Sequence, residues 1–160
     1  MCIRDRNKVA QARARGAKLV VVDPTCTNAA AKADEWIPIR PGTDGALALS
    51  MLNLLLNEYG LYDKEFLRIH TNGIYLIKSD GHYLRDENSG KPLVWDRSDG
   101  RTKVYDDETL EDPVIEGTYE AGGVQVQPAF QRLRDHVRQF DPKWASKVAT
   151  VPEKTIRRFT

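Results

Sequence analysis

The chain of 160 residues is long enough for one ordinary domain and too short for a large multidomain enzyme. Its formal net charge of +1 gives no basis for a nucleic-acid partner or for binding to an anionic membrane surface. A hydrophobic content of 41% with 29% charged residues is typical of a folded chain. The richest apolar run, residues 46–56, is shorter than a membrane helix requires, so direct membrane insertion is not expected.

Residues 1–6, Met-Cys-Ile-Arg-Asp-Arg, resemble a sequencing-adaptor read-through and not a signal peptide, because no apolar region follows them. We expect a non-native leader here, a gene that begins earlier, and a chain cut at both ends. The two cysteines, Cys2 and Cys26, form neither a metal-binding pair nor a disulfide framework. Each is expected to be a small buried or incidental thiol.

The first elements predict half of a βαβ unit. Residues 7–15 are rich in alanine and predict a helix, which Gly16 ends. The run Lys-Leu-Val-Val-Val at 18–22 is typical of a strand covered on both faces, as in a parallel sheet. Residues 29–33 predict a short helical turn and 35–39 a second strand, irregular or at an edge because it contains proline.

The next segment is dominated by a long apolar helix. Residues 45–59 predict a helix that is apolar nearly all round and therefore buried, and Gly60 ends it. A shorter helix is predicted over residues 63–70, with Phe66 and Leu67 facing inward.

The remaining chain changes character at residue 74. Residues 74–127 predict an irregular, hairpin-rich insertion with a thin core, because three turn pairs separate short β-branched or aromatic runs: Asp80-Gly81, Ser89-Gly90 and Asp99-Gly100. Residues 128–160 predict an amphipathic helix with proline in its first turn, followed by two shorter helices.

These elements together predict an α/β fold: a partial Rossmann-like parallel-sheet domain, interrupted by an irregular hairpin-rich insertion and closed by C-terminal helices. Its main α/β portion is expected over residues 7–73. Residues 128–160 are expected to return to the same domain.

Several catalytic patterns are missing. The sequence holds no phosphate-binding P-loop, no His-Glu-x-x-His helix and no Gly-x-Ser-x-Gly elbow. The three histidines, His70, His82 and His136, have no ligand spacing. The acidic clusters at 106–108 and 111–112 are more typical of a solvated loop than of an acid–base pair.

Two short elements carry the binding hypothesis. Asp23 follows a predicted strand directly, and the carboxyl edge of an open α/β sheet is where ligands bind. Its carboxylate could accept from ribose hydroxyls or from the N–H groups of a guanine; a structural or incidental role stays open. Gly42-Thr43-Asp44 precedes the long helix, where Thr43 or Asp44 could simply cap the helix or Asp44 could pair with a guanine.

The two elements together resemble the molybdopterin oxidoreductases of the dimethyl-sulfoxide-reductase type. The resemblance rests on Val-Val-Asp-Pro-x-x-Thr at 21–27 and on Ala-Asp-Glu-Trp-Ile-Pro-Ile-Arg-Pro-Gly-Thr-Asp-x-Ala-Leu at 33–47. It continues through 61–66 and 71–73, and the stretch 144–158 is similar to the segment that closes this part of the domain.

The resemblance implies a cofactor holder. The strand-end loop would line the ribose and guanine of a bis-molybdopterin guanine dinucleotide through Asp23, Pro24, Thr25 and Thr27, and the turn would read the base through Gly42, Thr43 and Asp44. Thr25 stands where the family usually has arginine, which puts any contact of that arginine in doubt. Arg40 is expected to support the turn.

The resemblance also implies what lies elsewhere. The molybdenum ligand, any [4Fe-4S] cluster of the parent and the second pterin-binding domain would lie outside this chain, so we expect the isolated fragment to be inactive. Its partners would be the remainder of the catalytic subunit, with iron–sulfur electron-transfer and membrane-anchor subunits common in the family. The parent would be bacterial or archaeal, cytoplasmic or periplasmic.

Two other interpretations stay open from the residues alone. A nicotinamide-dependent Rossmann enzyme would place an acidic residue like Asp23 after a glycine-rich loop, but the preceding residues hold only Gly16. A non-catalytic interaction module could use the aromatic residues of the 74–127 region as a docking surface, although the same residues would also serve as packing.

Overall fold

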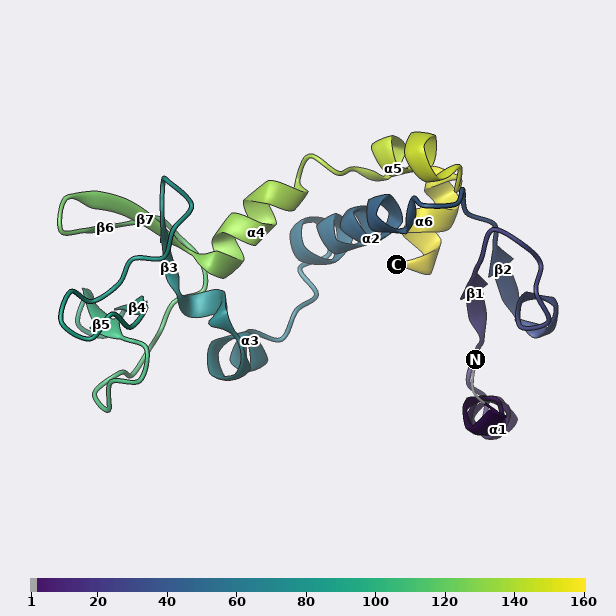
Figure 1. The fold of residues 1–160 in the computed structure, drawn as a ribbon, viewed down its shortest axis with the longest axis horizontal. Coiled ribbons are helices and arrows are strands. Elements are labelled where there is room, and N and C mark those ends of the chain that lie inside the picture. Colours follow the sequence, from purple (N-terminus) through teal and green to yellow (C-terminus); the bar gives the residue numbers. More distant parts are fainter. Residues whose placement is uncertain (1–2) are drawn as a thin grey trace. The chain divides into compact units, whose positions relative to one another are not determined.

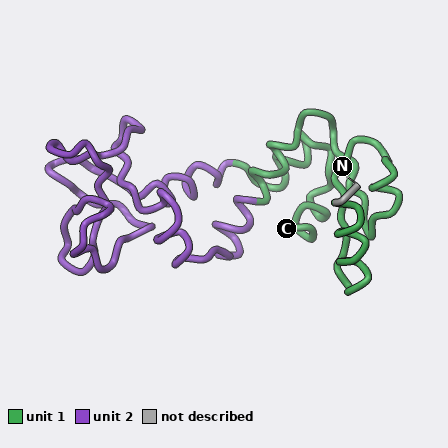
Figure 2. The backbone as a smooth tube through the Cα atoms, turned by 60° about the horizontal axis from the view of Figure 1, so that its bottom comes forward, with its two compact units in different colours: residues 1–51, 140–160 green, residues 52–139 purple. Residues whose placement is uncertain are grey.

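The computed structural model describes residues 3–160, with side chains described from residue 5 onward. The chain divides into two compact units, coloured separately in Figure 2. Unit 1 holds the residues up to 51 together with 140–160, and unit 2 holds residues 52–139. Of the predicted leader 1–6, Met1 and Cys2 lie outside the described residues, and the rest belongs to the first helix.

Unit 1 opens with helix α1, Ile3–Ala14, which starts earlier than predicted. Gly16 ends it as expected, at a φ of +94° that favours glycine. The Gly16 N–H donates to the Arg13 carbonyl (2.9 Å), and the Ala17 N–H donates to the Ala12 carbonyl (3.1 Å). These bonds satisfy carbonyl groups at the end of the helix that have no partner within it.

The central feature of unit 1 is a parallel pair of strands, β1 (Val20–Val22) and β2 (Glu35–Ile37). Figure 1 shows the two arrows pointing the same way. The connection between them contains the short 3-10 helix η1, Ala30–Lys32, which confirms the predicted helical turn. The valines of β1 are half-buried in the described chain, not covered on both faces as predicted.

Two acidic residues anchor the amino edge of this pair. The Asp34 carboxylate accepts the Leu19 N–H (2.8 Å) and lies 3.4 Å from the Arg13 guanidinium. The bond from the Leu19 N–H, helped by the nearby cations, holds the pKa of Asp34 below its ordinary value. Glu35 forms a two-pronged ion pair with Arg158, whose bonds lower the pKa of Glu35.

Helix α2, Asp44–Asn53, carries the chain from unit 1 into unit 2. A single helix was predicted up to residue 59, but the structure widens into the π-helical segment η2, Leu54–Glu58, in which the Tyr59 N–H donates five residues back to Leu54 (2.8 Å). Leu47, Leu54 and Leu56 are buried, whereas Ala48 is exposed, so burial is one-sided.

The C-terminal helices of unit 1 are α5, Pro142–Ala149, and α6, Glu153–Phe159. Asp141 caps α5 by accepting the Trp144 N–H (2.6 Å). The Arg40 N–H donates to the Ala149 carbonyl (3.0 Å), which ties the segment after β2 to the end of α5. Unit 1 buries apolar side chains from both regions: Ile37, Ile39, Ala145, Ala149, Val151 and Ile156.

Unit 2 contains the hairpin-rich region. It comprises α3 (Lys64–His70), η3 (Asn72–Ile74), α4 (Ala129–Val137), an antiparallel sheet ordered β3-β7-β6 and the hairpin β4–β5. The strands are β3 (Leu76–Lys78), β4 (Leu93–Asp96), β5 (Arg101–Val104), β6 (Tyr119–Ala121) and β7 (Val124–Pro128). The three predicted turn pairs all lie in turns, each with its glycine at positive φ. Parallel strands, antiparallel hairpins and helices together confirm the α/β class.

One expectation for unit 2 was wrong, and one hairpin was not separately predicted. Phe66 was predicted to face inward but is 55% exposed, and Ile69 on the same helix is 62% exposed. Helical spacing alone does not decide which apolar residues of a short helix face the core. The β6–β7 hairpin, which turns at Gly122-Gly123, was not predicted as a separate element, although a glycine pair is a turn signal.

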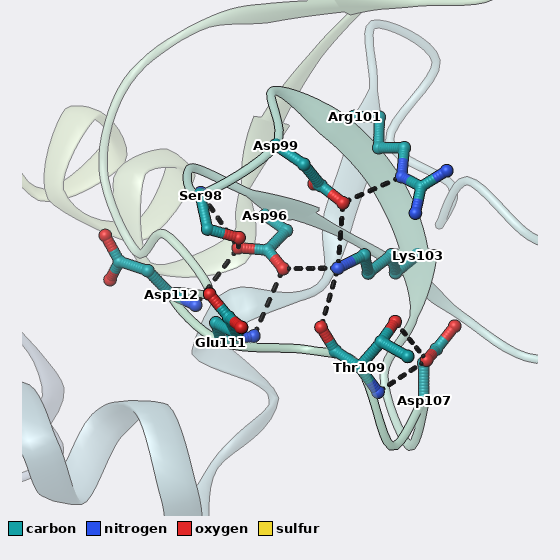
Figure 3. A network of polar contacts seen from close by, with 9 residues as sticks. All are labelled: Asp96, Ser98, Asp99, Arg101, Lys103, Asp107, Thr109, Glu111 and Asp112. Atoms are coloured by element: carbon teal, nitrogen blue, oxygen red, sulfur yellow. Dashed lines mark hydrogen bonds and ion pairs between the residues drawn. The ribbon is translucent and has the colours of Figure 1, made fainter.

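A buried ion pair organises the β4–β5 hairpin and the loop that follows it (Figure 3). Asp96 is fully buried, and its Oδ2 lies 2.8 Å from the Nζ of Lys103. The carboxylate also accepts the backbone N–H groups of three residues at 3.0–3.1 Å: Ser98, Glu111 and Asp112. Loop residues distant in sequence are therefore held on one carboxylate.

The ammonium group of Lys103 likewise has a full set of hydrogen-bond acceptors. Besides Asp96, its ammonium group contacts the Asp99 carboxylate at 2.9 Å and the Thr109 carbonyl at 2.7 Å. An ammonium group has three N–H donors, and each has an acceptor here. Burial by itself would raise the pKa of Asp96, but the bonds from Lys103 and from the backbone N–H groups outweigh it and lower this pKa well below its ordinary value.

Replacing Asp96 with asparagine should lower the free energy of unfolding by about 3 kcal/mol at pH 7, because the Lys103 charge would be left without its closest buried partner. A carboxylate whose pKa is lowered in the folded state stabilises fully above its unfolded pKa, about 4, and loses this contribution as the pH falls. The difference between wild type and variant should therefore shrink below about pH 4.

Urea unfolding at pH 7 and pH 3 measures both effects. Asp80→Asn is the matched control, since Asp80 lies in an exposed turn, where it pairs with Lys78 at the surface and accepts the His82 N–H. It should change stability little. Equal losses for the two variants at pH 7 would contradict a structural role for the buried pair.

Candidate functional site

The first site element is the loop that follows β1. Asp23 extends the parallel ladder, because its N–H donates to the Ile37 carbonyl at 3.2 Å. Its Oδ1 accepts the N–H (2.9 Å) and the hydroxyl (3.2 Å) of Thr25, and its Oδ2 accepts the Thr27 hydroxyl at 3.4 Å. Oδ1 is therefore used within the loop, whereas Oδ2 has one long contact and keeps capacity for a further donor.

The other loop residues are open to solvent. Pro24, Thr25 and Thr27 are exposed, and Thr27 also links the loop to η1 through the bond from the Ala31 N–H to its carbonyl (2.8 Å). Cys26 is exposed with a free thiol, which rules out the buried alternative and leaves the expectation of an incidental thiol.

The second site element is the turn before α2. Gly42 has a φ of +77°, and a Cβ added there would meet no atom within 4 Å. Glycine is thus required by the backbone conformation, and the space beside it is open. The Thr43 hydroxyl donates to the Arg40 carbonyl (2.7 Å), so this side chain closes the turn. This contact supports the predicted role of Arg40 as a neighbour that braces the turn.

The start of α2 leaves hydrogen-bonding groups uncommitted. The Thr43 carbonyl accepts the N–H groups of Ala46 (3.0 Å) and Leu47 (3.3 Å). Within residues 3–160, the N–H groups of Asp44 and Gly45 have no acceptor, and the exposed Asp44 carboxylate has no hydrogen-bond or ion-pair partner. Donors and a carboxylate therefore stand side by side at the positive end of a helix dipole.

The fold brings the two elements to one edge. In a parallel pair the carboxyl ends of both strands lie at the same edge, and the loop follows β1 while the turn follows β2. The segment between β2 and the turn is fixed by the buried Ile39 and by the bond from Arg40 to Ala149. All seven predicted site residues therefore lie on the two segments that leave this edge: Asp23, Pro24, Thr25, Thr27, Gly42, Thr43 and Asp44.

Trp36 contacts the candidate loop, and the sequence pattern did not single it out. Its indole N–H donates to the Asp23 carbonyl at 2.9 Å, and the side chain is 38% exposed. An aromatic residue in a strand predicts packing and gives no signal that it holds a neighbouring loop.

The groups at this edge include both hydrogen-bond acceptors and hydrogen-bond donors. A guanine offers the N1 and N2 donors and the O6 acceptor, and a ribose offers two hydroxyls. Oδ2 of Asp23 and the Asp44 carboxylate can accept, and the free N–H groups of α2 can donate. This edge is open to solvent, since the loop and the turn are mostly exposed.

The acidic residues and histidines outside this edge form no second candidate site among the described residues. Among the described residues no group of three or more histidine, cysteine or acidic side chains is arranged to hold a metal ion. In the acidic region, Asp106 pairs with Lys91 and Asp112 with Arg68 and Arg97, so these acids have structural partners. No helix within residues 3–160 is long and apolar enough to cross a membrane.

Comparison with known proteins identifies the family. A family model described as molybdopterin oxidoreductase matches residues 2–101, more than half of the chain. The chain belongs to the molybdopterin oxidoreductase family. This confirms the resemblance that the loop and the turn first indicated.

Relatives in this family are much longer than the chain. A sulfite dehydrogenase subunit of Allochromatium vinosum is 36% identical over 166 residues, covering 94% of this chain and 17% of that protein. The alpha subunit of perchlorate reductase from Dechloromonas aromatica is 31% identical over 196 residues, covering 96% and 21%. Among solved structures, acetylene hydratase from Pelobacter acetylenicus matches with a TM-score of 0.55 and 26% identity, covering 97% and 14%. The chain thus spans about a fifth or less of these relatives.

Replacing Gly42 with alanine should lower the free energy of unfolding by about 1 kcal/mol, because the φ of +77° is unfavourable for a residue with a Cβ. Gly45→Ala is the matched control: that glycine lies in the first turn of α2, has no positive φ and is also surrounded by open space. Alanine there should leave stability unchanged or raise it, because alanine favours helix. Urea unfolding measures both variants, and equal effects would contradict the backbone requirement.

Proposed function

We propose that this chain is the part of a molybdenum-dependent oxidoreductase that binds the guanosine end of a bis-molybdopterin guanine dinucleotide cofactor. The observation that carries the proposal is that the Asp23 loop and the segment leading to the Gly42-Thr43-Asp44 turn leave the same edge of the β1–β2 pair. Membership of the molybdopterin oxidoreductase family supplies the chemical class of the ligand.

The two elements would divide the nucleoside between them. Asp23 would accept from the ribose or guanine through Oδ2, with Pro24, Thr25 and Thr27 lining the same loop. Asp44 would accept from the N1 and N2 donors of guanine, and the open space beside Gly42 would allow the base to approach the backbone. Thr43 would act by closing the turn, since its hydroxyl is bonded to Arg40.

The bound cofactor would supply the oxygen-atom or electron transfer of the parent enzyme, and this chain would bind and orient one end of it. The relatives are named a dehydrogenase, a reductase and a hydratase, so the names do not converge on one reaction or substrate. We propose that the parent holds its molybdenum ligand and any [4Fe-4S] cluster outside this chain.

The remainder of the catalytic subunit is the first partner that this function requires. Two of the relatives are named as subunits, which supports additional iron–sulfur electron-transfer or membrane-anchor subunits in the parent. Within the chain, we propose that residues 7–73 form the cofactor-binding portion, with 74–127 as an insertion and 128–160 returning to the same domain. The grouping of α5 and α6 with β1 and β2 in unit 1 supports the return of residues 140–160, whereas 52–73 and 128–139 group with the insertion in unit 2.

Guanosine diphosphate, which represents the nucleotide end of the cofactor, should protect Cys26 from alkylation, because the exposed thiol lies between Thr25 and Thr27 in the proposed loop. Alkylation of the 160-residue chain by iodoacetamide, followed peptide by peptide with mass spectrometry, separates Cys26 from Cys2. The concentration dependence of protection gives a dissociation constant. Adenosine diphosphate should protect far less, since adenine lacks the N1–H and N2–H₂ donors of guanine.

Asp44→Ala should weaken this protection by about ten- to a hundredfold, because a hydrogen bond to a charged acceptor contributes about 1.5–3 kcal/mol. Glu65→Gln is the matched control, since Glu65 is an exposed acid in the first turn of another helix, α3. It should leave protection unchanged. Equal protection by the guanine and adenine nucleotides, or none by either, would overturn the proposed function.

A further inference from the structure

Asp23 has hydrogen-bond partners both within its own loop and on the neighbouring strand β2. Thr25 and Thr27 bond its carboxylate from within the loop, and the Ile37 carbonyl accepts its N–H from β2. The fourth contact comes from the Trp36 indole, whose N–H donates to the Asp23 carbonyl at 2.9 Å. Each hydrogen-bonding group of the residue is therefore engaged, with capacity left at Oδ2.

The Trp36 contact differs from the other three. It is a side-chain contact from outside the loop, so a single substitution can remove it without changing the loop sequence. Trp36 also stands on β2, the strand that continues into the Gly42-Thr43-Asp44 turn. The indole thus links β2, the strand that leads to the turn, to the backbone of the Asp23 loop.

The contact is not explained by packing alone. The side chain is 38% exposed, whereas its strand neighbour Ile37 is 2% exposed and belongs to the core. The partly buried ring therefore contributes some packing, but packing does not require the indole N–H to be directed at a carbonyl. What it supplies specifically is one N–H directed at a carbonyl, a donor that no aliphatic or phenyl side chain could offer.

We propose that Trp36 is a positioning residue for nucleotide binding. Its indole N–H holds the Asp23 backbone, and this keeps the Asp23 carboxylate at a fixed position relative to the turn before α2. This inference rests on the proposed function and assigns a role within the same site. Trp36 acts through Asp23 and does not itself need to touch the guanosine. Removing the N–H would free the loop to sample other positions, and the ligand would then have to order it again.

Trp36→Phe keeps an aromatic ring and removes the N–H. Because the bond lies at the surface, water can replace the lost donor, and the thermal midpoint should fall by no more than about 3 °C. The dissociation constant for guanosine diphosphate, measured by protection of Cys26, should rise about three- to tenfold. Trp144→Phe is the matched control, since this indole lies in the same unit and packs on Phe140 without contacting the loop.

A double-mutant cycle distinguishes positioning from general weakening. If Trp36 acts through the Asp23 carboxylate, Trp36→Phe should cause no further loss of binding in a chain that already carries Asp23→Ala. Additive losses would overturn the inference, as would unchanged binding by Trp36→Phe. If circular dichroism shows that the phenylalanine variant is unfolded, Trp36→Tyr, which also lacks the indole N–H, takes its place in the cycle.

The two proposals fail in different ways. If the wild-type chain shows no protection by guanosine diphosphate, the proposed function fails. If the wild type is protected and Trp36→Phe binds as the wild type does, the nucleotide site stands and the positioning role of Trp36 is wrong.

Discussion

The parallel hydrogen bonding of β1 with β2 is the constraint on which the candidate site depends. Strand direction decides where each connection emerges, and a parallel pair sends both of its outgoing segments to the same edge. An antiparallel pairing of the same residues would place the Asp23 loop and the Gly42-Thr43-Asp44 turn at opposite ends. The site therefore follows from the topology first and from the side chains second, as ligand sites in open α/β sheets commonly do.

The two edges of this pair differ in how their polar groups are used. At the amino edge, Asp34 and Glu35 are committed to Leu19, Arg13 and Arg158, and these bonds fix the strands to the helices on either side. At the carboxyl edge, Asp44 has no partner among the described residues, and Oδ2 of Asp23 has only a long contact. Charges at one edge stabilise the fold, and those at the other stay available for a ligand.

Local patterns in the sequence predicted much of this fold. Glycine at residue 16, the valine run of β1 and the Asp-Gly turn pairs each act through backbone geometry, which neighbouring residues determine. The long-range contacts could not be predicted. The Asp96–Lys103 pair takes three backbone donors from both sides of β5, and the Trp36 indole bonds a residue in another strand's loop. The change to a π-helix after Asn53 likewise had no local signal.

Asp96 and Asp44 show why an acidic residue cannot be assigned from its type alone. Asp96 is fully buried and bonded on both oxygens, so it has no capacity left for a ligand, and its low pKa reflects the strength of that bonding. Asp44 is exposed, beside free N–H groups at the start of a helix. If binding residues were chosen by burial and a shifted pKa, Asp96 would be selected, although its contacts are structural. Unused hydrogen-bonding capacity at the edge of the parallel pair selects Asp44 instead.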